Sequence, residues 1–254
     1  MNLYLNKLNF KINTMKNKFL ILILFLFTSS LFAQVNQVKV VSNNEGVKLV
    51  VNGQDFMING MNWDYVPIGT NYAYSLWKQP EDVIKSALDA EMGLLKNMGV
   101  NTIRVYTGIQ PKWISYIHEN FGIYTMLNHS FGRYGLTING VWTPVTDYRD
   151  AETKSQLLSD AKEMANTYKG TPGLLLFLLG NENNYGLFWS GAETEDFPEG
   201  EEQKKAVGEK RGRPMYKLMN EAAVLMKNLD GSHPVAICNG DFLFSDIVAE
   251  ECPD

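Results

Sequence analysis

The sequence has little of what metalloproteins, redox proteins and nucleic-acid-binding proteins use. Only two of its 254 residues are cysteines, Cys238 and Cys252, and their spacing matches no metal-binding motif. The net charge is −5, the pI is about 5.3, and no basic residues cluster along the chain, which excludes a typical nucleic-acid partner. Internal repeats and low-complexity tracts are absent too. Neither a metal ion nor an organic cofactor is implied.

The composition is that of a folded domain. Hydrophobic residues make up 45% of the chain, enough to form a sizeable core. The length suits one complete (β/α)8 barrel or one to two smaller domains. Aromatic residues make up 12%; their flat apolar rings suit sugar ligands, and they suit an ordinary core equally well.

The first 33 residues have the pattern of a signal peptide. A short basic segment at 15–18 precedes an unbroken apolar run at 19–27 and a small-residue stretch that ends at Ala33, the predicted cleavage site. Met15 is an alternative start. The run is too short for a lasting membrane span, although an uncleaved anchor is the alternative. We expect an exported protein: periplasmic, outer-surface or secreted. Export permits disulfides, but we interpret both cysteines as buried thiols.

After the signal peptide, the pattern predicts a β-hairpin within residues 34–52 and then alternating strands and helices over 53–254. The predicted strands are residues 56–62, 101–106, 122–129, 173–180 and 234–239. The predicted helices are residues 81–98, 112–120, 151–168, 214–229 and 242–251. The charged stretch 190–213 is predicted to be a solvated loop.

Apolar strands alternating with helices indicate a parallel sheet covered by helices. An open doubly wound sheet requires a phosphate-binding glycine loop after the first strand, and Gly60-Met61-Asn62-Trp63 lacks it. Polar and aromatic residues instead recur at the carboxyl ends of the strands, as in a (β/α)8 barrel. The fold class predicted is therefore an α/β (β/α)8 barrel of which about five units are present. These strand-end residues are Asn62 and Trp63, Arg104 and Tyr106, Asn128 and His129, Asn181 and Glu182, and Asn239 and Asp241.

The clearest chemical signal is the apolar run 174–179 that ends in Gly180-Asn181-Glu182. A carboxyl group at the rim of an apolar barrel is partly desolvated, which raises its pKa and keeps it protonated near neutral pH. Such an acid can protonate a glycosidic oxygen. The alternative is a structural role in which Glu182 caps the following helix.

Gly180-Asn181-Glu182 resembles the acid/base motif of glycoside hydrolase clan A. Residues 56–63, 94–106 and 122–124 resemble barrel segments of family 2 glycosidases, in the same order and spacing. The same segments are similar to fungal β-1,3-glucanosyltransferases of that clan. The resemblance covers about residues 53–254; it is specific for the clan and weak for the substrate.

The resemblance implies roles for particular residues. Glu182 matches the general acid/base, Asn181 the residue that orients the sugar, and Arg104 the arginine that lies under the nucleophile. Further sugar contacts are expected from Asn128 and His129, at the end of the third strand, and from the aromatic residues Trp63, Tyr106 and Trp189.

One departure from the family pattern is serious. The nucleophile should be a glutamate that ends strand seven, but only five barrel strands are predicted here. Glu250 and Glu251 do not replace it, because they lie on the helix after strand five. A retaining mechanism needs two carboxyl groups roughly 5–5.5 Å apart. We therefore expect a retaining glycosidase that acts on β-linked oligo- or polysaccharides, with this chain by itself inactive. The alternatives are a β-glucanosyltransferase and a non-catalytic glycan-binding barrel.

Overall fold

The computed structural model describes residues 35–44, 46–71, 73–106, 108–188 and 200–253. The predicted signal peptide and Trp189 lie outside these residues. From Val35 onward the chain forms one compact unit. In the part that is described, no helix has both the length and the apolar character needed to cross a membrane.

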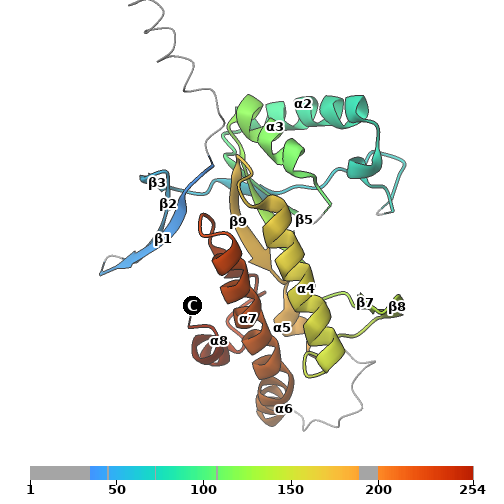
Figure 1. Ribbon diagram of the computed structural model, residues 1–254, viewed down its shortest axis with the longest axis vertical. Coiled ribbons are helices and arrows are strands. Elements are labelled where there is room, and N and C mark those ends of the chain that lie inside the picture. Colours follow the sequence, from blue (N-terminus) through green and yellow to red (C-terminus); the bar gives the residue numbers. More distant parts are fainter. Residues whose placement is uncertain (1–34, 45, 72, 107, 189–199, 254) are drawn as a thin grey trace, which may run out of the picture. The chain divides into compact units, whose positions relative to one another are not determined.

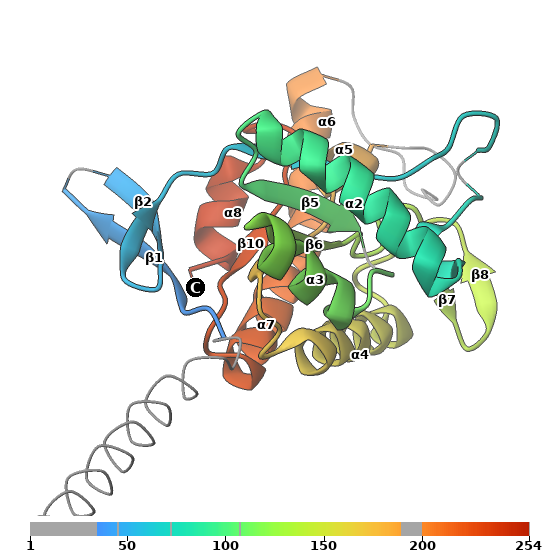
Figure 2. The same cartoon turned by 90° about the horizontal axis from the view of Figure 1, so that it is seen from above.

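The centre of the fold is a five-stranded, fully parallel sheet with the order β10-β9-β6-β5-β4. Figure 1 labels β9 and β5 of this sheet, and Figure 2 labels β10, β6 and β5. The strands follow one another in chain order across the sheet, which confirms the predicted α/β class and sequential order. Their bounds are β4 Gly60–Asn62, β5 Thr102–Tyr106, β6 Tyr124–His129, β9 Leu174–Leu179 and β10 Val235–Ile237.

Each connection between neighbouring strands contains a helix, and one more follows β10. These are α2 Glu81–Asn97, α3 Pro111–Phe121, α4 Ala151–Tyr168, α7 Arg213–Leu229 and α8 Ser245–Glu251. Their ends follow local chemistry. Pro111 opens α3, and Gly122 ends it in the left-handed conformation (φ 71°). The Asp150 carboxylate caps α4 by accepting a hydrogen bond from the Thr153 N–H at 2.8 Å.

Side-chain alternation divides the strand residues between two faces of the sheet. Ile103, Val105 and Leu127 lie in the main core with the buried sides of the helices, and α4 and α7 pack side by side over this face (Figure 2). Tyr124, Met126, Leu176 and Leu178 belong to a second, smaller core. We call these the helix face and the inner face.

The amino-terminal strands complete the inner face. β1 Val38–Asn43, β2 Gly46–Val51 and β3 Gln54–Phe56 form an antiparallel sheet. Val38 and Val51 lie in the same core as Leu176 and Leu178, and the Phe56 ring meets Tyr124 edge-on at 5.2 Å. The antiparallel sheet therefore packs on the apolar part of the inner face.

The predicted first barrel strand, residues 56–62, is two separate elements. Phe56 ends β3, and only Gly60–Asn62 joins the parallel sheet. The Asn101 side chain explains the break, because it accepts a hydrogen bond from the Asn59 N–H at 2.9 Å and donates to the Met57 carbonyl at 2.8 Å. The Asn59 N–H and the Met57 carbonyl thus bond the Asn101 side chain instead of the backbone of a neighbouring strand.

Other segments also differ from the predictions. Residues 200–212, expected in a solvated loop, form α6 Gly200–Val207 and a π-helical turn, Gly208–Gly212. The segment is not fully solvated, because Val207 lies in the main core and Gly208 and Gly212 are buried. Cys238 and Cys252 are free thiols that are only partly buried. The sequence patterns also gave no indication of four short elements: η1 Leu76–Lys78, β7 Leu136–Ile138, β8 Val141–Thr143 and α5 Asn183–Gly186.

Gly173, just before β9, is expected to be intolerant of any side chain. Its φ is +85°, and an added Cβ would lie 2.3 Å from His118 Cβ. Gly122 is the matched control, with φ +71° and nothing within 4 Å of an added Cβ. Gly122→Ala should lower the free energy of unfolding only by the cost of a left-handed alanine, roughly 1–2 kcal/mol. Gly173→Ala should cost about 1–3 kcal/mol more through overpacking. Equal losses in denaturant unfolding would contradict the contact with His118.

Candidate active site

The polar residues at the carboxyl ends of the strands are sorted by the same alternation. Arg104 pairs in register with Asn62 and Met126, and Tyr106 pairs with Asn128. Asn62, Arg104, Tyr106 and Asn128 therefore belong to the inner face. They lie nearer the carboxyl ends of the strands than the apolar core that contains Met126 and Leu178. They form the candidate site.

Arg104 links three strands through neutral amides. Its Nε and Nη2 donate to Asn128 Oδ1 at 3.0 and 2.6 Å, and Nη2 also donates to Asn181 Oδ1 at 2.9 Å. Asn128 is fully buried and donates through Nδ2 to the Gly180 carbonyl at 3.1 Å. Since these acceptors are all uncharged, the guanidinium charge is oriented by the bonds without being neutralised by them.

Tyr106 lies beside this cation, with the Arg104 guanidinium carbon 5.4 Å from the ring centroid. The ring is 41% exposed at the rim. Burial raises the pKa of Tyr106, and Arg104 partly offsets the rise. Cys238 also borders the cluster: its Sγ donates to Asn128 Oδ1 at 3.7 Å, and burial raises the pKa of its thiol. A raised pKa is the opposite of what an activated cysteine nucleophile needs.

Glu182 has a strained backbone and an exposed side chain. Its φ of 55° and ψ of 37° are left-handed, a conformation that costs a non-glycine residue roughly 1–2 kcal/mol. Backbone hydrogen bonds hold it: the Glu182 N–H donates to the Cys238 carbonyl at 2.8 Å, and the Glu182 carbonyl accepts from the N–H groups of Tyr185 at 3.0 Å and Gly186 at 3.4 Å.

The side chain of Glu182 makes no capping hydrogen bond to α5, so the alternative helix-capping role is wrong. The predicted desolvation of its carboxyl group is wrong as well, because the residue is exposed. It projects from the end of the strand instead of lying against apolar side chains.

Asn183 builds the turn that carries Glu182. Its Oδ1 accepts from the Asn181 N–H at 2.7 Å, and its Nδ2 donates to the Phe131 carbonyl and to Tyr148 Oη, both at 3.0 Å. Gly180 has a φ of 83°, and an added Cβ there would lie 2.8 Å from Asn183 Oδ1. The glycine is therefore required by the turn.

The loop after β6 adds residues that the sequence reasoning missed. Asn181 Nδ2 donates to Tyr134 Oη at 2.7 Å, and Arg133 Nε donates to the Asn181 carbonyl at 3.0 Å. The Arg133 guanidinium carbon lies 5.4 Å from the Tyr134 ring centroid. The one feature of the sequence that could have indicated these residues is that Arg133 and Tyr134 stand between two glycines, Gly132 and Gly135.

His129 does not reach this cluster. It follows Asn128 in β6 and so points to the helix face, where its Nε2 lies 3.9 Å from Asp160 Oδ2 of α4 and its Nδ1 accepts from the Phe131 N–H at 3.1 Å. Trp63 likewise follows Asn62, is 7% exposed and packs against Trp77 in the main core. The structure therefore does not support the predicted sugar contacts of these two residues.

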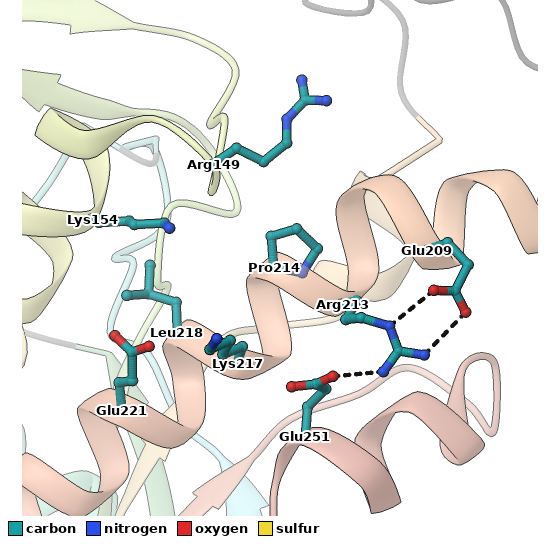
Figure 3. Close-up of a pocket in the computed structure, with 9 residues that line it drawn as sticks. All are labelled: Arg149, Lys154, Glu209, Arg213, Pro214, Lys217, Leu218, Glu221 and Glu251. Carbon is teal, nitrogen blue, oxygen red and sulfur yellow. Dashed lines mark hydrogen bonds and ion pairs between the residues drawn. The ribbon is translucent and has the colours of Figure 1, made fainter.

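A cavity of about 360 Å³ lies elsewhere, at the start of α7 (Figure 3). Arg213, one of the charged residues that line it, donates two hydrogen bonds of 2.9 and 3.0 Å to Glu209 and also bonds Glu250 and Glu251. None of the strand-end residues lines it. We therefore assign the candidate site to the rim. Across the described ranges, no three His, Cys, Asp or Glu side chains are arranged to hold a metal ion.

No protein-family model matches the sequence, and no curated protein matches it either. Solved structures do match the fold. A β-glucuronidase of Parabacteroides merdae with glycerol in its active site is 20% identical, with a TM-score of 0.53 over 84% of this chain and 21% of that one. A β-glucuronidase of Bacteroides uniformis is 13% identical, with a TM-score of 0.55 over 85% of this chain and 22% of that one.

A β-1,4-D-mannanase of Cryptopygus antarcticus is 14% identical, with a TM-score of 0.54 over 85% of this chain and 69% of that one. The chain thus spans about a fifth of the length of the β-glucuronidases. At these identities the likeness establishes the fold: an α/β fold with a parallel sheet, shared with glycosidases.

His129 generates a prediction about pH. Burial lowers its pKa below the ordinary 6.5, against a smaller opposing effect of Asp160. The folded state therefore binds fewer protons than the unfolded state below about pH 6.5, and stability falls as the pH falls through that range. His129→Asn keeps an acceptor for Phe131 N–H but does not titrate. Denaturant unfolding from pH 8 to 5.5 should show a shallower pH dependence for the variant, by at most about 1.4 kcal/mol per pH unit. An unchanged slope would contradict the burial argument.

Proposed function

We propose that residues 53–254 form part of the catalytic domain of a retaining glycoside hydrolase that acts on β-linked glycans, with Glu182 as its general acid/base. One observation carries the proposal. At the carboxyl end of β9 the backbone holds Glu182 in a left-handed conformation with its side chain free of any capping bond, directly after an asparagine that Arg104 fixes. Polar residues with a strained backbone at such a place are typical of active sites.

In this mechanism each residue has a separate task. Glu182 donates its proton to the glycosidic oxygen as the bond to the anomeric carbon breaks, and a second carboxylate attacks that carbon to form a glycosyl-enzyme. Glu182, now ionised, accepts a proton from water, whose oxygen displaces the enzyme carboxylate. Asn181, held by Arg104 and Tyr134, positions the sugar.

We assign the attacking carboxylate to no residue of the part of the chain that the structure describes. In the proposal it belongs to a further strand of the same barrel, as the resemblance to family 2 glycosidases implies, and this chain without it is inactive. Arg104 supports this placement, because its described hydrogen bonds go to neutral amides and its positive charge at the rim would stabilise an anionic carboxylate nearby.

The setting of this activity is also a proposal. Residues 1–33 would direct export, so the enzyme would act outside the inner membrane, on oligo- or polysaccharides. The solved structures of similar fold are glycosidases whose names specify β-glucuronides and β-1,4-mannan. They support the reaction class, with the sugar left open.

Kinetics of Glu182→Gln test the proposal in the enzyme that includes the attacking carboxylate. Glutamine keeps the shape but cannot donate a proton, so kcat on natural glycans should fall about 10²–10⁴-fold or more. Aryl glycosides with good leaving groups should lose less in the first step, because their departure needs little acid assistance. Azide added to Glu182→Ala should restore turnover, since azide attacks the glycosyl-enzyme without base assistance.

Glu119→Gln, an exposed change on α3, is the matched control and should keep full activity. Near-normal hydrolysis of natural glycans by Glu182→Gln would exclude Glu182 as the acid. Product analysis then separates hydrolysis from transfer to a second sugar.

A further inference from the structure

The β7–β8 hairpin presents an aromatic side chain that the proposed mechanism does not use. Asn139 (φ 50°) and Gly140 (φ 80°) form its two-residue turn, with the paired positive φ values that match strand twist. Thr137 is paired with Trp142 across the hairpin. Leu136 is buried and Ile138 packs on the core, so alternation places Trp142 on the opposite face, where it is 59% exposed.

The Trp142 ring lies against backbone. An added Cβ at Gly135 would lie 2.8 Å from Trp142 Cζ2 and 2.5 Å from the Thr143 carbonyl, and Gly135 has a φ of +93°. Only glycine fits there, and its lack of a side chain lets the indole edge approach the main chain. The ring is supported along this edge while much of its surface remains in solvent.

One hydrogen bond and two pairs of chain neighbours connect the Gly135 position to the candidate active site. Gly135 follows Tyr134, whose Oη accepts from Asn181 Nδ2 at 2.7 Å, and Asn181 precedes Glu182. Tyr134 is itself 52% exposed. In Figure 1 the hairpin and α5 lie at the same end of the sheet, the end to which the β9 arrowhead points.

We propose that Trp142 forms a distal carbohydrate subsite, on which a pyranose ring of the same β-linked glycan stacks while another unit lies at Glu182. This inference rests on the proposed function. Pyranose rings present a flat face of C–H groups, and a supported indole offers a large apolar surface to cover it. Single exposed apolar side chains are common on protein surfaces. This one differs because its ring meets Gly135, and the next residue along the chain, Tyr134, bonds Asn181.

The test is length-dependent binding to the 254-residue chain. Disaccharides and hexasaccharides of β-1,4-linked glucose, β-1,4-linked mannose and β-1,3-linked glucose are titrated by calorimetry and by tryptophan fluorescence. Trp142→Ala should weaken hexasaccharide binding about tenfold and leave disaccharide binding unchanged. Trp142→Phe should lose less affinity for the hexasaccharide. Val141→Ala, 67% exposed on the other face of the hairpin, is the matched control and should change neither.

The outcomes separate the two proposals. If a hexasaccharide binds and Trp142→Ala leaves its affinity unchanged, the subsite is refuted and the proposed function stands. If Trp142→Ala weakens both lengths equally, the residue acts through the fold and the subsite is again refuted. If the unsubstituted chain binds no member of the panel, the glycan subsite is overturned, while the kinetics of Glu182 variants still decide the proposed function separately.

Discussion

The guanidinium of Arg104 holds together the carboxyl ends of three neighbouring strands. Its bonds to Asn128 and Asn181 join β5, β6 and the end of β9. Asn128 in turn donates a hydrogen bond to the Gly180 carbonyl. Asn128 is fully buried, so loss of these partners would leave polar atoms unsatisfied, at a cost of about 1–3 kcal/mol for each group. The geometry of the rim therefore depends on one cation and two amides.

Glu182 derives its position from the backbone around it. A strand residue would leave its side chain against one face of the sheet, but Gly180 and the Asn183 side chain turn the chain immediately after β9. A bulge lies in the same strand, where Thr125 pairs with Leu174 and Met126 with Leu176. Leu175 is the extra residue, so the neighbours Leu175 and Leu176 both reach the inner face and Leu178 follows by ordinary alternation. Packing and turn chemistry together present Glu182 at the rim.

The inner face is thus divided along its length. The β1–β3 sheet covers its apolar part through Val38 and Val51, and polar side chains occupy its carboxyl end. The loops that follow the strands extend this polar region, with Tyr134 on one side and Asn184, which bonds Asp241 at 3.0 Å, on another. The sheet thus supplies one set of polar groups at the rim, and the loops supply further ones, as is usual where binding residues lie on loops held by a rigid scaffold.

The sequence by itself determined the α/β class, the order of the strands and the position of Asn181-Glu182 at a strand end, because apolar periodicity and helix-ending glycines are local signals. It could not decide which of two neighbours, Asn128 or His129, Asn62 or Trp63, faces the rim. Both faces of this sheet are covered by apolar side chains, so hydrophobicity does not tell them apart. Nor could it reveal the left-handed turn at Glu182 or the bond from Asn181 to Tyr134, 47 residues apart. Those depend on which segments the fold brings together, and only the tertiary structure decides that.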